Sequence, residues 1–543
     1  MRMEGRSAIA LAIFLACPPC ASALNPSLDI NQYAHHAWTV REGFFKSAIN
    51  SIAQTPDGYL WLGTEFGLLR FDGVQPVSWQ PPAGQHLPGS FISRLLAARD
   101  GRLWIGTRDG LASWKDGKLT PYPELAGQHV QSLLEDPEGT IWVGAYGVPT
   151  GRLCAIQSGE TRCYGEDGRF GSNVLSLHED GGGSLWAGAH SGLWRWKPGP
   201  PKLYPMPPTE IRALIDGDNG ALLIALPSGI RQLVDGRAEA YPLPAAGRQF
   251  TPNRLFRDRN NGLWIGTPGQ GLLHVHQGRT DSFAQPDGLS SDYIAALFED
   301  REGNIWVGTL GGLDRFRDFA IPAISTRQGL SNDTVGSVLA ARDGSVWLGT
   351  PDGLNRWNDG RATIYRKGSG LPDDSVGSLF QDDRGRIWAS SRRGIAYFED
   401  GRFNPENGVP DGYVHSIAGD SAGNLWISQD QSLLHMLGGS VVEQIPWAKL
   451  GHKDSATTLL SDPAQGGLWI GFFQGGVEYF RDGQVRARYG SADGLGAGRV
   501  EGLQLDRDGT LWAATEGGLS RVKNGRVATL ASKNGLPCDT FTG

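Results

Sequence analysis

His274 and His276 come closer to a metal-ligand pattern than any other residues of the sequence. Residues two positions apart on a strand share one face, and imidazole nitrogens are common zinc ligands. No cysteine or pair of carboxylates stands beside them in the sequence, so packing explains the two imidazoles better than a metal. The acidic segment 299–304 lacks the spacing of an EF-hand loop and suits a tight turn. We therefore expect no metal site and no cofactor.

The motifs of common catalytic machineries are missing from the sequence. There is no Gly-x-Ser-x-Gly turn to expose a nucleophilic serine, and no glycine-rich loop of the kind that binds phosphate. The chain is accordingly expected not to be an enzyme. The alternative is an enzyme acting on polysaccharide, in which Glu65 or Asp109 would be needed for turnover.

A different set of residues could bind a ligand without covalent chemistry. They are aromatic, carboxylate, amide, imidazole and guanidinium side chains that follow a repeated Gly-Thr or its equivalent, and they vary from copy to copy while the surrounding motif stays constant. The candidates are Glu65, Phe66, Arg108, Asp109, Tyr146, His190, Asp352, Arg392, Gln429, Asp430, Gln474 and Glu516. Such a mixture suits a small polyhydroxylated molecule such as an oligosaccharide. For any single residue, a solvated loop is the simpler explanation.

The motif that carries these residues is Asp-x-x-Gly-x-[Leu/Ile/Val]-Trp-[Leu/Ile/Val]-Gly-Thr-x-x-Gly-Leu. Its tryptophans are Trp61, Trp104, Trp142, Trp186, Trp264, Trp306, Trp347, Trp388, Trp426, Trp469 and Trp512, and Leu223 replaces tryptophan in one degenerate copy. The mean spacing of about 41 residues, with alternating strand patterns, is typical of a β-propeller with one blade for each repeat. The fold class is therefore all-β, with tandem propellers.

Each repeat divides into four strands joined by Asp-Gly or Asn-Gly turns, which are favoured in hairpins. In the eighth copy we predict strands at residues 334–339, 346–349, 354–357 and 362–365. The tryptophan is expected to lie between neighbouring sheets, because burying an indole contributes a large hydrophobic term. The glycine two positions later is expected to let adjacent sheets approach closely.

The seventh copy lacks the turn that precedes a fourth strand, so the N-terminal segment 34–40 is expected to supply that strand. This closes a seven-bladed propeller over residues 31–318. A second propeller, residues 319–543, holds five repeats and the start of a sixth, so it is incomplete and the sequence is expected to be truncated.

Export is expected from residues 1–23, where a short apolar run follows a basic start and ends in Ala21-Ser22-Ala23, the pattern of a secretory signal peptide. Cys154 and Cys163 flank a predicted two-residue hairpin turn at Ser158-Gly159. They are therefore expected to face each other and form a disulfide, with two free thiols as the alternative. The net charge of −7 argues against a nucleic-acid partner.

The repeat, together with the recurring Gly-Leu-[Ser/Pro]-x-Asp-x-[Val/Ile] that precedes several copies, resembles the two-component regulator propeller repeat. This resemblance covers about residues 31–543. It implies the periplasmic ligand-binding region of a sensor whose full-length relatives are anchored in the inner membrane. Their missing C-terminal output domain is a histidine kinase or a diguanylate cyclase. The expected partners are a small-molecule or oligosaccharide ligand, that output domain and a second copy of the chain as a homodimer. An interaction scaffold for proteins is a further alternative.

Overall fold

The computed structural model describes residues 24–204, 206, 209–243, 249–319, 323–358, 360–410, 412–534 and 538–539. The predicted signal peptide, residues 1–23, lies outside these residues, as does most of the predicted start of a sixth repeat in the second propeller. The chain divides into two compact units, Met1–Pro322 and Ala323–Gly543. The described residues form twelve four-stranded antiparallel sheets, so the predicted all-β class is confirmed.

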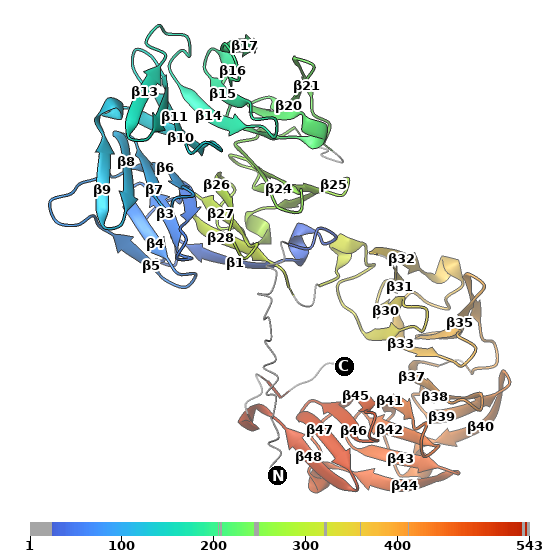
Figure 1. The fold of residues 1–543 in the computed structure, drawn as a ribbon. Helices are drawn as coiled ribbons and strands as arrows, with labels where there is room; N and C mark the ends of the chain where they lie inside the picture. Colours follow the sequence, from blue (N-terminus) through green and yellow to red (C-terminus); the bar gives the residue numbers. More distant parts are fainter. Residues whose placement is uncertain are drawn as a thin grey trace, which may run out of the picture. The chain divides into compact units, whose positions relative to one another are not determined.

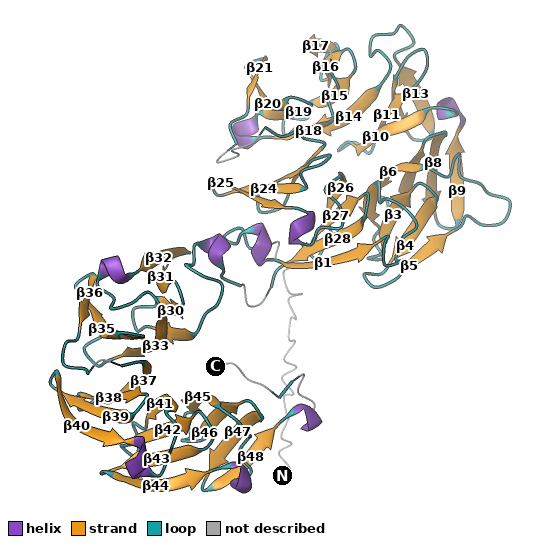
Figure 2. Ribbon diagram, turned by 180° about the vertical axis from the view of Figure 1, so that it is seen from behind, coloured by secondary structure: helices purple, strands orange, loops and turns teal. Residues whose placement is uncertain are grey.

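The first unit contains seven of these sheets, which Figures 1 and 2 show fanned around a common centre. Its strands are β1 (Ala34–Thr39), β2 (Ser51–Gln54), β3 (Leu60–Thr64), β4 (Gly67–Phe71), β5 (Pro76–Trp79), β6 (Ile92–Ala97), β7 (Leu103–Thr107), β8 (Gly110–Lys115), β9 (Lys118–Tyr122), β10 (His129–Glu135), β11 (Ile141–Tyr146), β12 (Arg152–Gln157), β13 (Glu160–Tyr164), β14 (Val174–Glu179), β15 (Leu185–Ala189), β16 (Gly192–Lys197), β17 (Lys202–Tyr204), β18 (Ala213–Asp216), β19 (Leu222–Leu226), β20 (Gly229–Val234), β21 (Arg237–Ala240), β22 (Arg254–Arg257), β23 (Leu263–Gly266), β24 (Leu272–His276), β25 (Arg279–Phe283), β26 (Ile294–Glu299), β27 (Ile305–Thr309) and β28 (Gly312–Arg317).

The second unit contains the other five sheets. Its strands are β29 (Ser337–Ala340), β30 (Val346–Thr350), β31 (Gly353–Asn358), β32 (Arg361–Tyr365), β33 (Val376–Gln381), β34 (Ile387–Ser391), β35 (Gly394–Glu399), β36 (Arg402–Pro405), β37 (Val414–Gly419), β38 (Asn424–Gln429), β39 (Ser432–Leu437), β40 (Ser440–Pro446), β41 (Ala456–Ser461), β42 (Leu468–Phe472), β43 (Val477–Arg481), β44 (Gln484–Tyr489), β45 (Val500–Leu505), β46 (Leu511–Thr515), β47 (Gly518–Lys523) and β48 (Arg526–Leu530). The short 3-10 helices are η1 (Ile30–Gln32), η2 (Pro123–Leu125), η3 (Asp218–Gly220), η4 (Gln285–Asp287), η5 (Thr326–Gln328), η6 (Lys367–Ser369), η7 (Trp447–Leu450), η8 (Ser491–Asp493) and η9 (Ser532–Asn534).

The first strand of the eighth repeat is shorter than the sequence predicts. Strand β29 begins at Ser337, whereas we expected the strand to start at residue 334. The side chain of Asn332 accepts a hydrogen bond from the backbone N–H of Thr334 at 2.7 Å. This side-chain contact holds the preceding residues in a turn, and turns of this kind compete with strand pairing.

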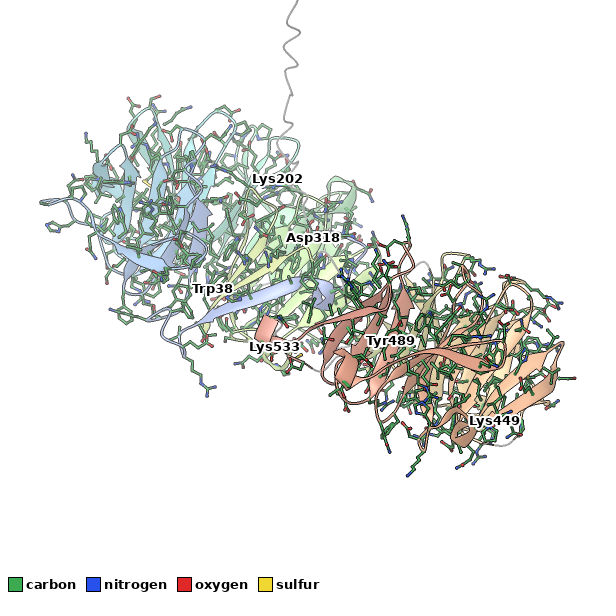
Figure 3. The ribbon with its side chains drawn as sticks, turned by 90° about the horizontal axis from the view of Figure 1, so that it is seen from below. Trp38, Lys202, Asp318, Lys449, Tyr489 and Lys533 are labelled. Atoms are coloured by element: carbon green, nitrogen blue, oxygen red, sulfur yellow. A yellow bond between two sulfur atoms is a disulfide. The ribbon has the colours of Figure 1, made fainter. Side chains whose placement is uncertain are left out.

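The N-terminal strand completes the last sheet of the first unit, as the missing turn of the seventh repeat predicts. Strand β1 pairs antiparallel with β28, from Ala34 opposite Arg317 to Thr39 opposite Gly312. Trp38, marked on β1 in Figure 3, stacks on Trp306 of β27 with ring centroids 5.6 Å apart. Segments from the two ends of the unit are therefore joined by backbone pairing and by aromatic packing.

The innermost strands of the first unit contact one another in a closed order. The order is β2, β6, β10, β14, β18, β22 and β26, with β26 contacting β2 again. In the second unit, contacts run in sequence from β29 through β33, β37 and β41 to β45. The first unit thus has a central axis that is surrounded by strands on all sides.

The repeat tryptophans lie between neighbouring sheets, which confirms their predicted role. Trp61 of β3 packs in one buried cluster with Ile92 and Ile105 of the next sheet. The glycine two positions later is needed for this close packing. A Cβ atom on Gly106 would lie 2.6 Å from the Cγ1 atom of Val130 in the following sheet, which is too close for any side chain.

Most repeat tryptophans also donate a hydrogen bond to an aspartate six residues earlier. The Nε1 atom of Trp142 lies 2.8 Å from Asp136 Oδ2, and Trp264 Nε1 lies 2.7 Å from Asp258 Oδ2. The other carboxylate oxygen of each aspartate accepts backbone N–H groups of the turn between the first and second strands. The motif therefore couples a tight turn to a buried indole.

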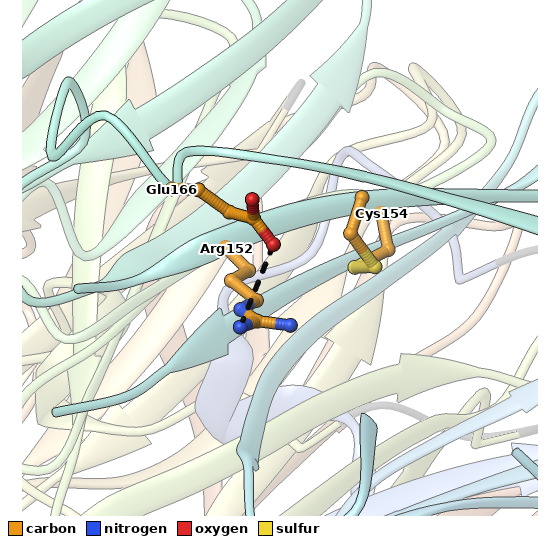
Figure 4. Close-up of a disulfide and its surroundings, with 4 residues drawn as sticks. Arg152, Cys154 and Glu166 are labelled. Carbon is orange, nitrogen blue, oxygen red and sulfur yellow. Dashed lines mark ion pairs between the residues drawn. A yellow bond between two sulfur atoms is a disulfide. The ribbon is translucent and has the colours of Figure 1, made fainter. Parts of the chain in front are cut away.

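The hairpin of β12 and β13 places Cys154 opposite Cys163, with their Cα atoms 4.0 Å apart and a disulfide between them (Figure 4). Ser158 and Gly159 both take positive φ values, which a two-residue hairpin turn requires. Beside the disulfide, Arg152 and Glu166 form an ion pair at 3.9 Å.

Candidate functional site

The predicted ligand residues all lie where the second strand of a sheet ends and the third begins. In the first unit, Glu65 and Phe66 form the β3–β4 turn, Arg108 and Asp109 form the β7–β8 turn, and Tyr146 ends β11. The other candidates occupy the equivalent places: His190 in the β15–β16 turn, Asp352 in β30–β31, Arg392 in β34–β35, Gln429 at the end of β38, Asp430 just after it, Gln474 in β42–β43 and Glu516 in β46–β47. We call the end of each unit that carries these turns its loop face.

Three of the predicted residues meet around a histidine that the sequence analysis did not select. His129 begins β10 and lies directly opposite Tyr146. The guanidinium of Arg108 lies over the ring of Phe91, 4.4 Å from its centroid, and that ring contacts His129 edge to face. Asp109 acts electrostatically on the same histidine. The loop face of these two sheets thus combines aromatic surface with both signs of charge.

The electrostatics of this cluster are dominated by positive charge. Burial lowers the pKa of His129 to about 4, and the charges of Arg108 and Arg94 add to the lowering, whereas Asp109 opposes it. At neutral pH the imidazole is therefore neutral and can accept or donate a hydrogen bond. Gln131 already holds one ring nitrogen, with Nε2 lying 3.0 Å from His129 Nδ1.

In the second unit, several predicted residues are engaged within the protein, among them Asp352 and Glu516 as hydrogen-bond acceptors. Gln429 is buried, and its amide donates a hydrogen bond to the Pro410 carbonyl at 2.8 Å. Asp430 is exposed and pairs with His415 at 2.8 Å. The exposed ring of Phe473, by contrast, lies under the guanidinium of Arg499 at 5.4 Å. Aromatic and charged groups therefore share the loop face of this unit as well.

Sequence reasoning missed Arg94 and Arg254, which lie on innermost strands just inside the loop face. Arg94 of β6 pairs with Gly106, and Arg254 of β22 pairs with Gly266. The signal that could have found them is the register, because the equivalent positions of the other five sheets hold small residues. These are Ser51, Ser132, Ser176, Ala213 and Ala296.

His274, His276 and Asp281 form a group of potential metal ligands whose donor atoms lie within 4.8 Å of one another. The two imidazole rings are stacked, however, with centroids 4.3 Å apart and planes 13° apart. Lone pairs in nearly parallel rings point in parallel directions and do not converge on one ion. His276 also has both nitrogens engaged, with Pro26 O at 2.8 Å and with Asp281 Oδ2 at 2.7 Å.

This histidine pair is better explained as an anchor for the N-terminal segment. Burial alone would lower the pKa of His276, but its hydrogen bonds to Asp281 and Pro26 raise that pKa above its ordinary value. Asp281 also accepts the backbone N–H of Ile30 at 3.2 Å. The His276–Asp281 pair thus ties residues before β1 to the β22–β25 sheet.

The fold and its repeats define a protein of the β-propeller class. The family model described as "Two component regulator propeller" matches residues 43–66, 86–109, 124–147, 288–311, 370–393 and 408–431. Each matched segment ends at a turn of the loop face. The chain carries two-component regulator propeller repeats.

A solved structure shares the fold at low sequence identity, and a second one is less similar. An extracellular domain assigned to a hybrid two component system of B. thetaiotaomicron has a TM-score of 0.69 and 22% identity, covering 93% of this chain and 73% of that one. Virginiamycin B lyase from Staphylococcus aureus has a TM-score of 0.43 and 15% identity, covering 53% of this chain and 100% of that one. No curated protein matches the chain. Within the described residues, no helix has the length and apolar character of a membrane span.

Proposed function

We propose that the chain is the ligand-binding sensor module of a two-component signalling protein. In this proposal it consists of two propellers, residues 31–318 and 319–543, exported to the periplasm by the signal peptide 1–23. A histidine kinase or diguanylate cyclase in the full-length protein would receive the signal. The observation that carries the proposal is the placement of the family repeats, because each matched segment ends in a turn with exposed, variable side chains.

The mechanism is a population shift. A ligand that binds one conformation of the module more tightly than another moves the equilibrium toward that conformation, and the output domain reports the change. The loop face suits this role, because aromatic rings such as Phe66 offer apolar surface while Arg108 and Asp109 offer hydrogen bonds. We propose a small molecule or an oligosaccharide as the ligand, and a homodimer as the assembly that transmits its binding.

The test is a thermal-unfolding screen of residues 24–543 against neutral and acidic oligosaccharides. A ligand that binds only the folded state at a hundred times its Kd adds about 2.7 kcal/mol of stability, so its melting temperature rises measurably. The expected result is a rise for at least one oligosaccharide.

A matched pair of variants shows whether the loop face is responsible. Phe66 and Val74 are both exposed apolar residues of the β2–β5 sheet, with 69% and 65% of their surfaces accessible, at opposite ends of that sheet. Phe66→Ala should weaken binding and Val74→Ala should not, if the ligand occupies the first unit. No stabilisation by any oligosaccharide would contradict the proposal, and turnover of a bound glycan would favour the enzyme alternative.

A further inference from the structure

Arg94 and Arg254 lie on opposite sides of the first unit. Their strands, β6 and β22, are not neighbours in the closed order: β6 contacts β2 and β10, and β22 contacts β18 and β26. The positive charge of Arg254 nevertheless acts on Arg94. Because β6 and β22 stand on opposite sides of the closed ring and each carries its arginine opposite the repeat glycine, the two arginines lie at the same level on either side of the axis that the strands enclose.

Neither guanidinium has an acidic partner. Within the part of the chain that the structure describes, no carboxylate lies within ion-pairing distance of Arg94 or Arg254. Arg94 Nη1 donates to its neighbour's carbonyl, Ser93 O, at 2.6 Å. Arg254 donates from Nε to Ala295 O at 2.7 Å and from Nη1 to Asn253 O at 2.8 Å. Backbone carbonyls orient both groups but do not neutralise them.

This pattern contrasts with that of two other arginines of the same unit. Arg259, for example, also crosses to the next sheet and donates to Asp300 O, but it has Glu299 as an ion-pair partner at 3.5 Å. Arg212, at the start of the fifth sheet, lies 3.2 Å from Glu210. Unpaired charges in a desolvated place are costly unless an opposite charge joins them.

The lowered pKa values of the two arginines reflect this cost of burying a charge. Burial lowers the pKa of Arg94 to about 9, and burial also lowers the pKa of Arg254. Both side chains are nevertheless partly accessible to solvent. Tyr293, just before β26, acts on both guanidinium groups and brings a phenolic hydroxyl to the same region.

We propose that Arg94 and Arg254 form an anion site on the axis of the first unit, just inside its loop face, for a carboxylate or sulfate group. Arginine suits both groups, because its planar fork donates paired hydrogen bonds to their oxygens. The inference deepens the proposed function and rests on it in one respect: it makes the ligand of the sensor an acidic small molecule, such as a uronic acid or a sulfated sugar. Phe91 and Arg108 would then contact the rest of that ligand at the rim.

The test uses residues 24–543 and three probes: galacturonate, sulfate, and galactose as the uncharged counterpart of galacturonate. Isothermal titration calorimetry at low ionic strength, where charge interactions are least screened, should show binding of at least one of the two anions. Galactose should bind at least ten times more weakly than galacturonate if the carboxylate is recognised, and sulfate binding alone would assign the site to sulfated ligands. Arg94→Gln and Arg254→Gln should each weaken anion binding by about ten-fold, the effect of losing a charged hydrogen-bond partner.

Two controls separate binding from folding. Arg259→Gln removes a paired arginine of the same unit and should leave anion affinity unchanged. Arg94→Lys keeps the charge and should retain part of the binding that Arg94→Gln loses. A second readout is the NMR titration of His129, whose low pKa should rise when an anion offsets the charge of Arg94.

The outcomes distinguish the site from the sensory function. Anion binding that neither Arg94→Gln nor Arg254→Gln weakens would overturn the site, as would failure of both anions to bind. If neutral oligosaccharides still stabilise the protein in that case, the proposed function stands without the site. If an anion binds through the two arginines but does not change the output of the full-length protein, the site stands and the sensory role fails.

Discussion

The two units are built from one repeat, yet they fill the space between their innermost strands differently. In the first unit the residue two positions after the repeat tryptophan is glycine in every sheet except one, where Ala225 replaces it. In the second unit the same place holds Gly349, Ser390, Ser428, Gly471 and Ala514. The Ser428 hydroxyl donates to Ala456 O of the next sheet at 2.6 Å, so a side chain contacts the next sheet at the place where glycine elsewhere lets that sheet approach closely.

The strand that faces this position differs as well. The first unit carries Arg94 and Arg254 there, without acidic partners in the described chain, whereas the second carries small residues such as Ser337, Ser416 and Thr458. Glu478, a charged group that the second unit buries, is paired: it contacts both His452 and Arg488. The difference indicates that the repeat motif determines the four-stranded sheets and their spacing, whereas residues of the innermost strand can vary in charge.

The largest expected effect comes from removing an indole that is packed in the core and also donates a hydrogen bond. Trp264 is fully buried and bonds to Asp258, so Trp264→Ala should destabilise the first unit by about 3–5 kcal/mol. Hydrogen exchange followed by mass spectrometry should show faster exchange in residues 249–319. If exchange in the second unit rises equally, the units unfold together and their comparison as separate bodies fails.

A smaller effect should come from exchanging the residues that set the spacing between sheets. Gly106→Ala places a methyl group against Val130 and should cost about 1–3 kcal/mol, because the innermost strands cannot move apart freely. Ser428→Gly in the second unit should cost only about 1 kcal/mol, the value of one lost hydrogen bond. Urea unfolding of the two variants measures both changes. Equal costs would mean that the two units are packed equally tightly.

Two repeat tryptophans offer a stabilising change, one in each unit. Within the described residues, the Nε1 atoms of Trp104 and Trp347 have no hydrogen-bond partner, because alanine occupies the aspartate position six residues earlier. Ala98→Asp and Ala341→Asp should each supply that partner and raise stability by about 1 kcal/mol. Thermal unfolding measures the gain. A lower stability of either variant would show that burying the new carboxylate destabilises the protein more than the new hydrogen bond stabilises it.

A further effect is the pH dependence that His129 gives to the first unit. The pKa of His129 is about 4 in the folded protein and 6.5 ordinarily, so the unfolded chain binds more protons between these values. Stability should therefore fall as pH drops from about 6.5 toward 4, and His129→Asn should reduce that slope. Unfolding curves between pH 4 and 7 give the comparison, and an unchanged slope in the variant would assign the dependence to other groups.

Much of the fold could be predicted from the sequence, because tryptophan and glycine recur at fixed spacing and each has a packing reason. The pairing of β1 with β28 followed from one missing turn, and the placement of the loop residues followed from the strand order. Arg94 and Arg254 could not be found in this way. A bulge in β6 sets which residue faces Gly106, and single-sequence patterns do not reveal bulges.

The burial of Gln429 was equally hidden, since its amide reaches back to Pro410 across a turn whose path the sequence does not specify. The positions of the repeat-motif residues follow from their spacing along the chain. The partners of loop side chains, by contrast, depend on how several turns pack against one another. The ligand residues therefore stay a prediction that only binding measurements can test.

The pairing of β1 with β28 in the closing sheet also sets an order of events during synthesis. Strand β1 lies near the beginning of the chain and emerges early, but its partner β28 ends at Arg317. The growing chain must therefore keep an apolar strand with Trp38 unpaired until nearly three hundred further residues have followed, because closing so long a loop depends on its distant end. A nascent chain arrested before that point would expose an open sheet edge, and holding such intermediates apart is a task for a folding helper.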